Sequence, residues 1–362
     1  MTIVPFSDES YPAQLDEKLN KVRRLLSDTD IPEPEVYESP ASGYRMRAEF
    51  KVWQEGSTAF YAMYKKGEYK TPYLIEEFTP GYHRINELMP RLLAEINQSE
   101  TLRKRLFQAE FLTTLAGETV ITLIYHKKLD DAWHAEAEAL TSLLSVSIIG
   151  RSRKQKVIIG RDYVIEKLSV LGREYTYQQI ESSFTQPNAV ICQKMLTWAV
   201  EKSLDIGGDL LELYCGNGNF TLPLAQNFDK VLATEISKVS VNSALYNMRE
   251  NNVENINVVR MSSEDFSQAL DNVRPFRRLK DIALEDYNFT TIFVDPPRAG
   301  LDEHTTEVAK RFQNIMYISC NPETMARDIQ AMSASHKVVE FAVFDQFPFT
   351  DHIECGAVLM KR

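Results

Sequence analysis

The segment DLLELYCGNGNF, at residues 209–220, combines an apolar strand with a glycine-containing turn and the start of a helix. Gly216 and Gly218 allow the backbone of this turn to approach a bound ligand closely. The pattern continues on both sides as strands and helices in alternation, with helices near 189–203 and 220–227 and strands at 210–214 and 230–235. This alternation predicts an α/β domain with a doubly wound, mostly parallel, Rossmann-like sheet.

The first half of the chain follows other patterns. Residues 11–28 have apolar residues at helical spacing, and IPEPEVYESP then interrupts the helix. Apolar and polar residues alternate in YRMRAEFKVW and TAFYAMYKKGEYK, which indicates antiparallel strands. Further strands are expected at FLTTLAG and TVITLIYHK, and helices at 85–96 and 131–144. We therefore expect an N-terminal helical segment at 1–40, a mixed α+β domain at 41–180 and the α/β domain at 181–362.

Composition limits the class of protein. The 362 residues are 44% hydrophobic and 25% charged, which is ordinary for a soluble globular protein. No apolar run approaches the roughly 18–20 residues of a membrane span, and MTIVPFSDES lacks the regions of a secretory signal. We expect a cytoplasmic protein whose four widely spaced cysteines stay reduced. Because the sequence contains no CxxC pair, we expect no metal site and no iron-sulfur cluster.

Charge is unevenly distributed along the chain. The net charge is −10, but residues 41–160 carry 17 Lys and Arg against 14 Asp and Glu. A local basic surface is therefore compatible with a globally acidic chain, and such a surface can bind phosphate.

The glycine turn at 215–219 favours a cofactor without a pyrophosphate, because it lacks the third glycine of GxGxxG. Glu235 lies 19 residues after Gly216, which is close to the spacing of a carboxylate that binds a ribose diol. Each feature alone is more typical of a tight turn or a solvated carboxylate. Together with Asp295 and the two prolines of VDPPR, they indicate an adenosyl cofactor, and S-adenosylmethionine fits best.

A nucleophile is predicted in MYISCNPETMARD, at residues 316–328, where a strand delivers Cys320 to a polar turn. Cys215 and Cys355 flank apolar strands and are expected to be inert core thiols. Addition of a thiolate to C6 of uracil makes C5 nucleophilic toward a sulfonium methyl group, so this cysteine suits methylation of a pyrimidine carbon. A cation such as Arg298 would raise the thiolate fraction of Cys320.

The same reaction requires a base that removes the C5 proton before the cysteine is eliminated. Glu354 in DHIECGAVL is the candidate, with His352 as a weaker rival. Glu354 could instead be a salt-bridged strand residue.

The motifs FTQPN (184–188), LELYCGNGNF, VDPPR, YISCNPET and DQFPFTDHIECG (345–356) resemble those of the RNA uracil-5-methyltransferase family, most closely its tRNA-modifying branch. The resemblance covers most of the chain. It implies that Cys320 is the nucleophile and Glu354 the proton acceptor. It also assigns to the S-adenosylmethionine site the residues Gln186, Tyr214, Asn219, Glu235 and Asp295.

The resemblance further implies an RNA-recognition role for residues 41–180 and a T-arm substrate, with uridine 54 flipped out of the folded tRNA to reach Cys320. Ribosomal-RNA members commonly carry a four-cysteine motif or an amino-terminal OB-like domain, and this sequence has neither. Tyr44, Phe50 and Trp53 could stack on bases, although a core position is expected for the last two. The basic residues to examine for RNA contacts are Arg45, Arg47, Lys51, Arg103, Lys104, Arg105 and the run RSRKQK at 151–156.

Several alternatives remain open. Arg298 after the proline pair disfavours a cytosine-5 RNA methyltransferase, which would carry a cysteine there, and an adenine amino-methylase, which would favour an aromatic residue. The incomplete glycine motif disfavours a dehydrogenase. Uracil-5 methylation of another RNA, either ribosomal or tRNA-like, and an RNA-folding module with non-essential chemistry are the remaining readings.

Overall fold

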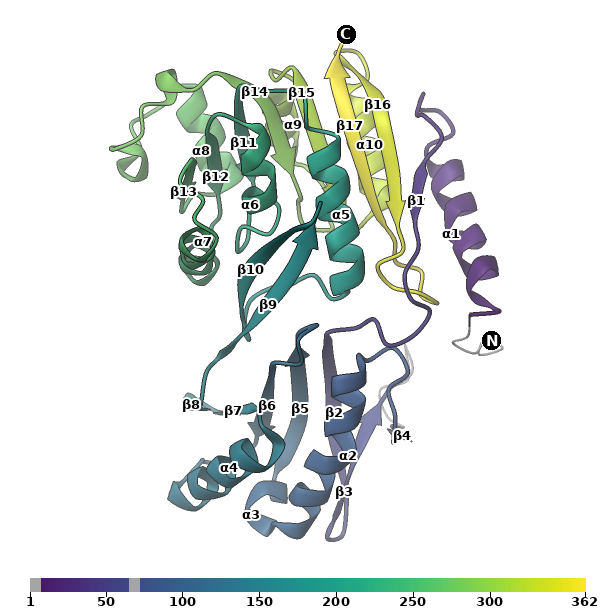
Figure 1. Cartoon of the computed structure of the whole chain (residues 1–362), viewed down its shortest axis with the longest axis vertical. Helices are drawn as coiled ribbons and strands as arrows, with labels where there is room; N and C mark the ends of the chain where they lie inside the picture. The colour runs from purple at the N-terminus through teal and green to yellow at the C-terminus, as the bar shows by residue number, and fades with distance from the viewer. Residues whose placement is uncertain (1–7, 65–71) are drawn as a thin grey trace. The chain divides into compact units, whose positions relative to one another are not determined.

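The computed structural model describes residues 8–64 and 72–362, which form two compact units (Figure 1). The first unit contains the described residues up to Pro40 together with Leu168–Gln178 and Val190–Arg362. The second unit contains Ala41–Lys167 and Gln179–Ala189. This division differs from the expected boundaries at residues 40 and 180, because the N-terminal segment and residues 168–178 belong to the same unit as the C-terminal half of the chain, whereas residues 179–189 belong to the second unit.

An eight-stranded sheet forms the centre of the first unit, with strand order β1-β16-β17-β15-β14-β11-β12-β13. Strand β17 is antiparallel to both neighbours, and the other pairings are parallel. The predicted doubly wound, mostly parallel sheet is therefore confirmed. The strands are β1 Glu35–Tyr37, β11 Asp209–Leu213, β12 Val231–Thr234, β13 Ile256–Val259, β14 Phe289–Val294, β15 Asn314–Ser319, β16 His336–Phe344 and β17 Glu354–Lys361.

Helices cover both faces of this sheet (Figure 1), so the central strands β11 and β15 are buried at every position. The predicted helix at 220–227 is divided into a short α-helix and a 3-10 turn. The helical elements are α1 Tyr11–Leu25, α5 Ala189–Glu201, α6 Thr221–Leu224, η1 Ala225–Asn227, α7 Lys238–Glu250, α8 Ser263–Leu270, η2 Arg277–Leu279, η3 Leu284–Asp286, α9 Glu303–Ala309 and α10 Pro322–Met332.

The N-terminal segment completes one edge of the sheet. Helix α1 confirms the helix predicted at 11–28, and its apolar face includes the buried residues Leu15 and Val22. The segment IPEPEVYESP does more than end this helix, because it supplies β1, which pairs in parallel with β16. The ring of Tyr37 stacks on that of Phe344 at a centroid distance of 4.8 Å.

The second unit is a seven-stranded sheet of order β4-β3-β2-β5-β6-β7-β8, antiparallel except where α4 connects β6 to the parallel β7. Its helices α2 His83–Gln98, α3 Glu100–Arg103 and α4 Asp131–Leu144 pack on one face and close the main core, which confirms the predicted helices at 85–96 and 131–144. The strands are β2 Arg47–Glu55, β3 Thr58–Met63, β4 Tyr73–Ile75, β5 Leu106–Thr113, β6 Thr119–Tyr125, β7 Ser147–Ser152 and β8 Gln155–Ile159. Strands β9 Tyr163–Val170 and β10 Arg173–Ile180 form a separate two-stranded sheet.

Two expectations for the antiparallel strands need comment. Phe50 is buried in the core, but Trp53 is 41% exposed, so its predicted core position is wrong. Trp53 lies near the end of β2, where the last residues of the strand are exposed. The expected strand TAFYAMYKKGEYK is represented by β3, and its continuation at residues 65–71 lies outside the described residues.

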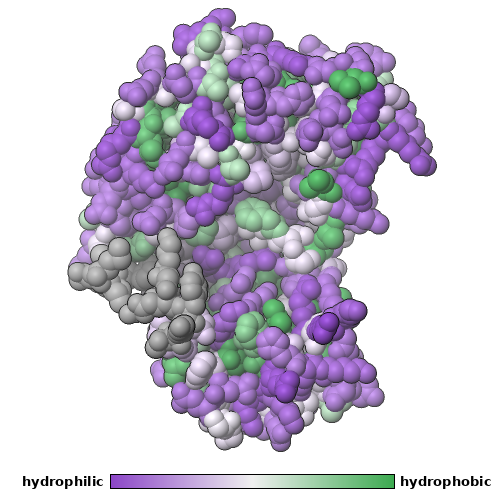
Figure 2. Space-filling model, turned by 180° about the vertical axis from the view of Figure 1, so that it is seen from behind, coloured by the Kyte–Doolittle hydropathy of each residue, from purple (hydrophilic) through white to green (hydrophobic). Residues whose placement is uncertain are grey.

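Among residues 8–64 and 72–362, no helix is both long and apolar enough to cross a membrane. The face shown in Figure 2 is mainly hydrophilic, with hydrophobic residues scattered over it.

Candidate active site

Three predicted site residues follow strands of the central sheet at the same edge. Tyr214 follows β11, Asp295 follows β14 and Cys320 follows β15. These strands are parallel neighbours, with Leu213 opposite Val294 and Val294 opposite Tyr317. Parallel strands present their carboxyl ends at one edge, which is where open α/β sheets bind ligands.

Glu354 reaches this edge from the opposite direction. It is the first residue of β17, and the antiparallel register pairs Ser319 with Cys355. The next position along each strand brings Cys320 opposite Glu354. The insertion of an antiparallel strand beside β15 thus places the predicted base next to the predicted nucleophile.

Exposure distinguishes Cys320 from the other three cysteines. Cys192, Cys215 and Cys355 are buried, whereas Cys320 is partly exposed. Burial raises the pKa of the Cys320 thiol to about 11, with further increases from the negative charges of Glu354 and Asp295 and a decrease from Arg298. In the ligand-free protein the thiol is therefore accessible but mostly protonated at neutral pH.

The carboxyl groups around Cys320 also favour their neutral forms. Burial raises the pKa of Asp295 to about 7. Glu354 is 6% exposed, and burial followed by the charge of Asp295 holds its pKa well above the usual range, while Arg298 acts in the opposite direction. This edge of the sheet therefore disfavours additional negative charge and favours a ligand that brings positive charge.

The glycine turn and the predicted ribose-binding carboxylate form one corner of the site. Gly216 N donates to Glu235 Oε2 at 3.1 Å, and Ser237 N donates to Glu235 Oε1 at 2.7 Å. Gly216 has φ of +55°, and a Cβ there would meet nothing within 4 Å, so the turn borders open space. Glu235 is thus positioned beside the turn by backbone hydrogen bonds.

The two polar residues that the resemblance assigns near this turn have different environments. Tyr214 has a φ of +64°, uncommon for a residue with a side chain, and its hydroxyl lies 2.8 Å from Ser263 Oγ. Asn219 Nδ2 donates to Cys192 Sγ at 3.4 Å, and the backbone carbonyl of Asn219 accepts a hydrogen bond from the Tyr177 hydroxyl. The strained backbone at Tyr214 is typical of a functional turn.

Buried carboxyl groups test whether this region suits a positively charged cofactor. Glu212 and Thr221 are buried and flank the glycine turn in sequence. Burial raises the pKa of Glu212 to about 8, against a hydrogen bond with Thr221 that lowers it, and the charge of Asp295 raises it further. Additional negative charge is therefore disfavoured here, and a ligand that brings positive charge fits the residues present.

A hydrogen-bond network that the sequence did not predict connects the VDPPR loop to the turn after Cys320. Asn321 Nδ2 donates to Arg298 O at 3.0 Å, and its Oδ1 accepts from Glu323 N at the start of α10. Arg298 Nη2 lies 3.2 Å from His352 Nδ1. The asparagine before Pro322 could have been recognised as a helix N-cap, but its second bond to the VDPPR loop depends on tertiary structure.

Gln186 lies in the second unit, in the segment 179–189. Its assignment to the cofactor site therefore continues to rest on the resemblance alone.

Several of the basic residues proposed for RNA contacts have intramolecular partners. Arg45 Nε donates to Arg47 O at 2.8 Å, and Arg47 Nη2 donates to Ser183 O at 3.0 Å. Arg151 Nη2 lies 2.6 Å from Glu181 Oε2. Burial lowers the pKa of Arg45 and of Arg47. These three side chains contribute to the packing of the second unit.

Residues 10–362 match the family model described as tRNA (Uracil-5-)-methyltransferase. The chain belongs to this family. Two relatives are named tRNA/tmRNA (uracil-C(5))-methyltransferase. The one from Saccharophagus degradans is 60% identical over 354 residues, covering 98% of this chain and 97% of the relative. The one from Cellvibrio japonicus is 57% identical over 357 residues, covering 99% and 97%.

The fold is also similar to that of a solved structure. The crystal structure of Pyrococcus abyssi tRNA (uracil-54, C5)-methyltransferase in complex with S-adenosyl-L-homocysteine superposes with a TM-score of 0.75 at 24% identity, covering 97% of this chain and 83% of that one. Membership of the tRNA (uracil-5-)-methyltransferase family confirms the predicted enzyme class and the predicted methyl donor, S-adenosylmethionine.

Proposed function

We propose that this tRNA (uracil-5-)-methyltransferase modifies uridine 54 in the T-arm through a covalent adduct between Cys320 and uracil C6. The observation that carries the proposal is the juxtaposition at one sheet edge of a partly exposed cysteine with a buried carboxyl group, Glu354. The position in tRNA is the one in the name of the Pyrococcus abyssi enzyme of similar fold. The proposed location is the cytoplasm, because the substrate is tRNA.

Tyr214, Asn219, Glu235 and Asp295, and on the resemblance alone Gln186, would hold S-adenosylmethionine, which would supply an electrophilic methyl group and a positive charge. The chain's own residues prepare the uracil. Cys320 Sγ forms a bond to C6 and the displaced π electrons increase the nucleophilicity of C5, which then carries both the new methyl group and its original proton. Glu354 accepts that proton, the C5–C6 double bond re-forms and the Cys320 thiolate leaves.

The charges around the site determine when Cys320 and Glu354 become ionised. Glu354 can act as a base only when it is ionised, and in the free protein its pKa is well above the usual range. Arg298 lowers the pKa values of both Cys320 and Glu354. A cationic ligand acts in the same direction, so the nucleophile and the base become competent when the site is filled.

A test of the base is the accumulation of an RNA adduct in Glu354→Gln. Addition and methyl transfer precede proton removal, so this variant should retain a protein–RNA species that survives denaturing electrophoresis and contains methylated uracil. Normal turnover of Glu354→Gln without such a species would reject Glu354 as the base. Transfer to a tRNA with uridine 54 replaced by cytidine tests the position, and unchanged labelling of that tRNA would reject uridine 54.

A second substrate is favoured by the names of the relatives, which include tmRNA. We propose that a tRNA-like stem-loop presenting a uridine in the same context is also methylated. Labelling of tmRNA by the wild type, compared with a copy lacking that uridine, tests this extension independently of the tRNA result.

A further inference from the structure

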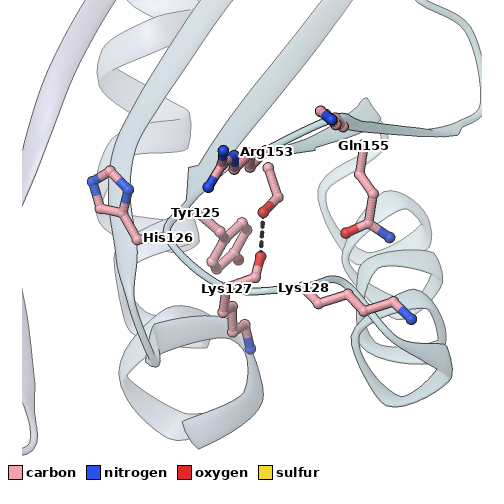
Figure 3. Close-up of a pocket in the computed structure, with 8 residues that line it drawn as sticks. Tyr125, His126, Lys127, Lys128, Arg153 and Gln155 are labelled. Carbon is pink, nitrogen blue, oxygen red and sulfur yellow. Dashed lines mark hydrogen bonds between the residues drawn. The ribbon is translucent and has the colours of Figure 1, made fainter.

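Exposed arginines of this protein differ in what their guanidinium groups contact. Arg153 and Lys154 are exposed in the lining of a basic cavity of about 560 Å³ in the second unit (Figure 3), which suits the RNA-recognition role expected for residues 41–180. The side chain of Arg327, on α10 of the first unit, is also 56% exposed. Its guanidinium is nevertheless used within the protein, where it binds a loop of the candidate active site.

The loop that Arg327 contacts consists of residues 298–301, which follow the two prolines of VDPPR and are called the Arg298 loop below. Arg327 Nη2 donates to Ala299 O at 3.0 Å and to Leu301 O at 2.9 Å. Arg327 Nε donates to Asp328 Oδ1 at 2.8 Å, so the adjacent residue orients the same guanidinium. Two backbone carbonyls of the Arg298 loop are therefore bound by one arginine that is itself held in place.

Asp328 connects the Arg298 loop to the strand that leads to the nucleophile. Asp328 is 2% exposed, and its Oδ2 accepts from Leu301 N at 2.8 Å and from the Tyr317 hydroxyl at 2.7 Å. Tyr317 is buried on β15, three residues before Cys320. Hydrogen bonds to a carboxylate are stronger than those between neutral groups, so Asp328 is a firm link between the loop and the strand.

The first turns of α10 also bind the remaining carbonyl at the start of the loop. Asn321, the N-cap of α10, donates from Nδ2 to Arg298 O at 3.0 Å, and Thr324 Oγ1 donates to the same oxygen at 3.4 Å. Positions 321, 324 and 328 lie on one side of a helix, and Cys320 directly precedes this helix. One face of α10 therefore fixes the Arg298 loop relative to the cysteine.

We propose that Arg327 and Asp328 are positioning residues, which hold the Arg298 loop on α10 and thereby direct the charge of Arg298 toward Cys320 and Glu354. The inference rests on the proposed function for the roles of Cys320 and Glu354. Arg298 favours the ionised forms of both groups. Because misplacement of a catalytic group by about 1 Å can cost roughly 100-fold in rate, a loosened loop should impair the reaction without loss of any reacting group.

The test is the rate at which iodoacetamide alkylates Cys320 in the ligand-free, full-length protein, with peptide mapping to identify the modified residue. Asp328→Ala removes the link between loop and strand, whereas Asp328→Asn keeps a carbonyl oxygen that can accept from Leu301 N and the Tyr317 hydroxyl. Arg327→Met removes the contacts to the loop carbonyls. Its side chain is more than half exposed, so this variant should fold normally even if Asp328→Ala does not.

The matched control is Arg311→Met. It breaks an exposed ion pair between Arg311 and Asp271, which also lies in the first unit but does not involve the Arg298 loop. This variant removes the same charge as Arg327→Met, so a general effect of lost positive charge would appear in both.

Arg327→Met and Asp328→Ala should slow alkylation to the rate of Arg298→Ala, while Asp328→Asn and the control should remain near the wild-type rate. Adding Arg298→Ala to Arg327→Met should cause no further slowing, because both changes remove the same effect. In methyl transfer, Arg327→Met should lower kcat by about 10–100-fold and change KM less. Alkylation of Arg327→Met at the wild-type rate, or additive slowing in the double variant, would overturn the proposal.

Alkylation needs neither tRNA nor methyl donor, so it separates this proposal from the proposed function. Slowed alkylation of Arg327→Met, with no methyl transfer to tRNA by the wild type, would support the positioning role and reject the proposed function. Normal methyl transfer by the wild type, with unchanged alkylation of Arg327→Met, would reject only the positioning role.

Discussion

Lys18 Nζ lies 2.6 Å from Asp345 Oδ1, in a buried ion pair that joins the first helix to the segment before Glu354. Lys18 Nζ also donates to Phe347 O at 2.7 Å, and Gln14 Nε2 donates to Asp345 Oδ2 at 2.7 Å. Phe349 N in turn donates to Gln14 Oε1. Helix α1 therefore fixes the conformation of residues 345–353, which lead into the strand that carries the proposed base.

Replacement of Lys18 by methionine should destabilise the protein by about 3–5 kcal/mol, because it leaves the Asp345 carboxylate buried without its cation. Urea denaturation measures this loss. The control is Arg23→Ala, which breaks the exposed pair of Arg23 with Glu33 and should cost less than about 1 kcal/mol. Equal losses for the two variants would show that the buried pair does not hold α1 in place.

Gly300→Ala should destabilise the loop that carries Arg298. Gly300 has φ of +76°, and a Cβ there would lie 2.6 Å from Asp328 Oδ2 and 2.7 Å from Arg327 Nη2. The matched control is Gly56→Ala, since Gly56 has φ of +59° with nothing within 4 Å of the added atom. We expect the first variant to lose about 1–3 kcal/mol more stability than the second and to lose kcat as well. Equal stabilities would mean that the loop adjusts freely.

The reactivity of Cys320 should depend steeply on pH. Its pKa is raised to about 11, so the rate of alkylation by iodoacetamide in the ligand-free protein should increase about tenfold per pH unit between pH 7 and 9. Arg298→Ala should slow alkylation, because Arg298 lowers the pKa of this thiol. Peptide mapping identifies the modified cysteine. A rate that stops increasing below pH 9 would contradict the proposed environment.

Glu166 should make the second unit less stable as pH rises. Its pKa is raised to about 7 by burial, above the value of a carboxyl group in the unfolded chain, so the folded state retains a proton that the unfolded state has released. The stability present below about pH 4.5 is therefore lost progressively up to about pH 7. Glu166→Gln, which keeps an acceptor for Leu115 N, should reduce this loss. Thermal unfolding at pH 5, 6 and 7 is the measurement, about the interval in which the shifted group titrates. An unchanged pH profile would exclude Glu166 as a contributor.

The central sheet could be predicted well from the sequence, because its strands and turns are specified by patterns among neighbouring residues. The strand and turn at 209–220 and the polar turn after Cys320 can be recognised from periodicity and turn chemistry, and both were found at the carboxyl edge of the sheet. The orientation of Glu354 could not be derived in this way. It depends on β17 running antiparallel beside β15, and no local pattern specifies which neighbour a strand takes.

The contacts that could not be predicted from the sequence are mainly those between distant parts of the chain. Lys18 and Asp345 are separated by 327 positions, and β1 pairs with a strand from the other end of the chain. Helical periodicity identified α1 but gave no information on its partner. Charge alone likewise did not distinguish Arg151, which is bound to Glu181, from Arg153 and Lys154 in the same run.

The most direct test of the proposed mechanism is transfer of labelled methyl from S-adenosylmethionine to unmodified tRNA, with the wild type compared with Cys320→Ala and the product nucleoside identified. The predicted result is 5-methyluridine at position 54 with the wild type and no label with Cys320→Ala, although the variant still binds tRNA. Label at undiminished rate with Cys320→Ala, or no labelled 5-methyluridine in tRNA with the wild type, would contradict it.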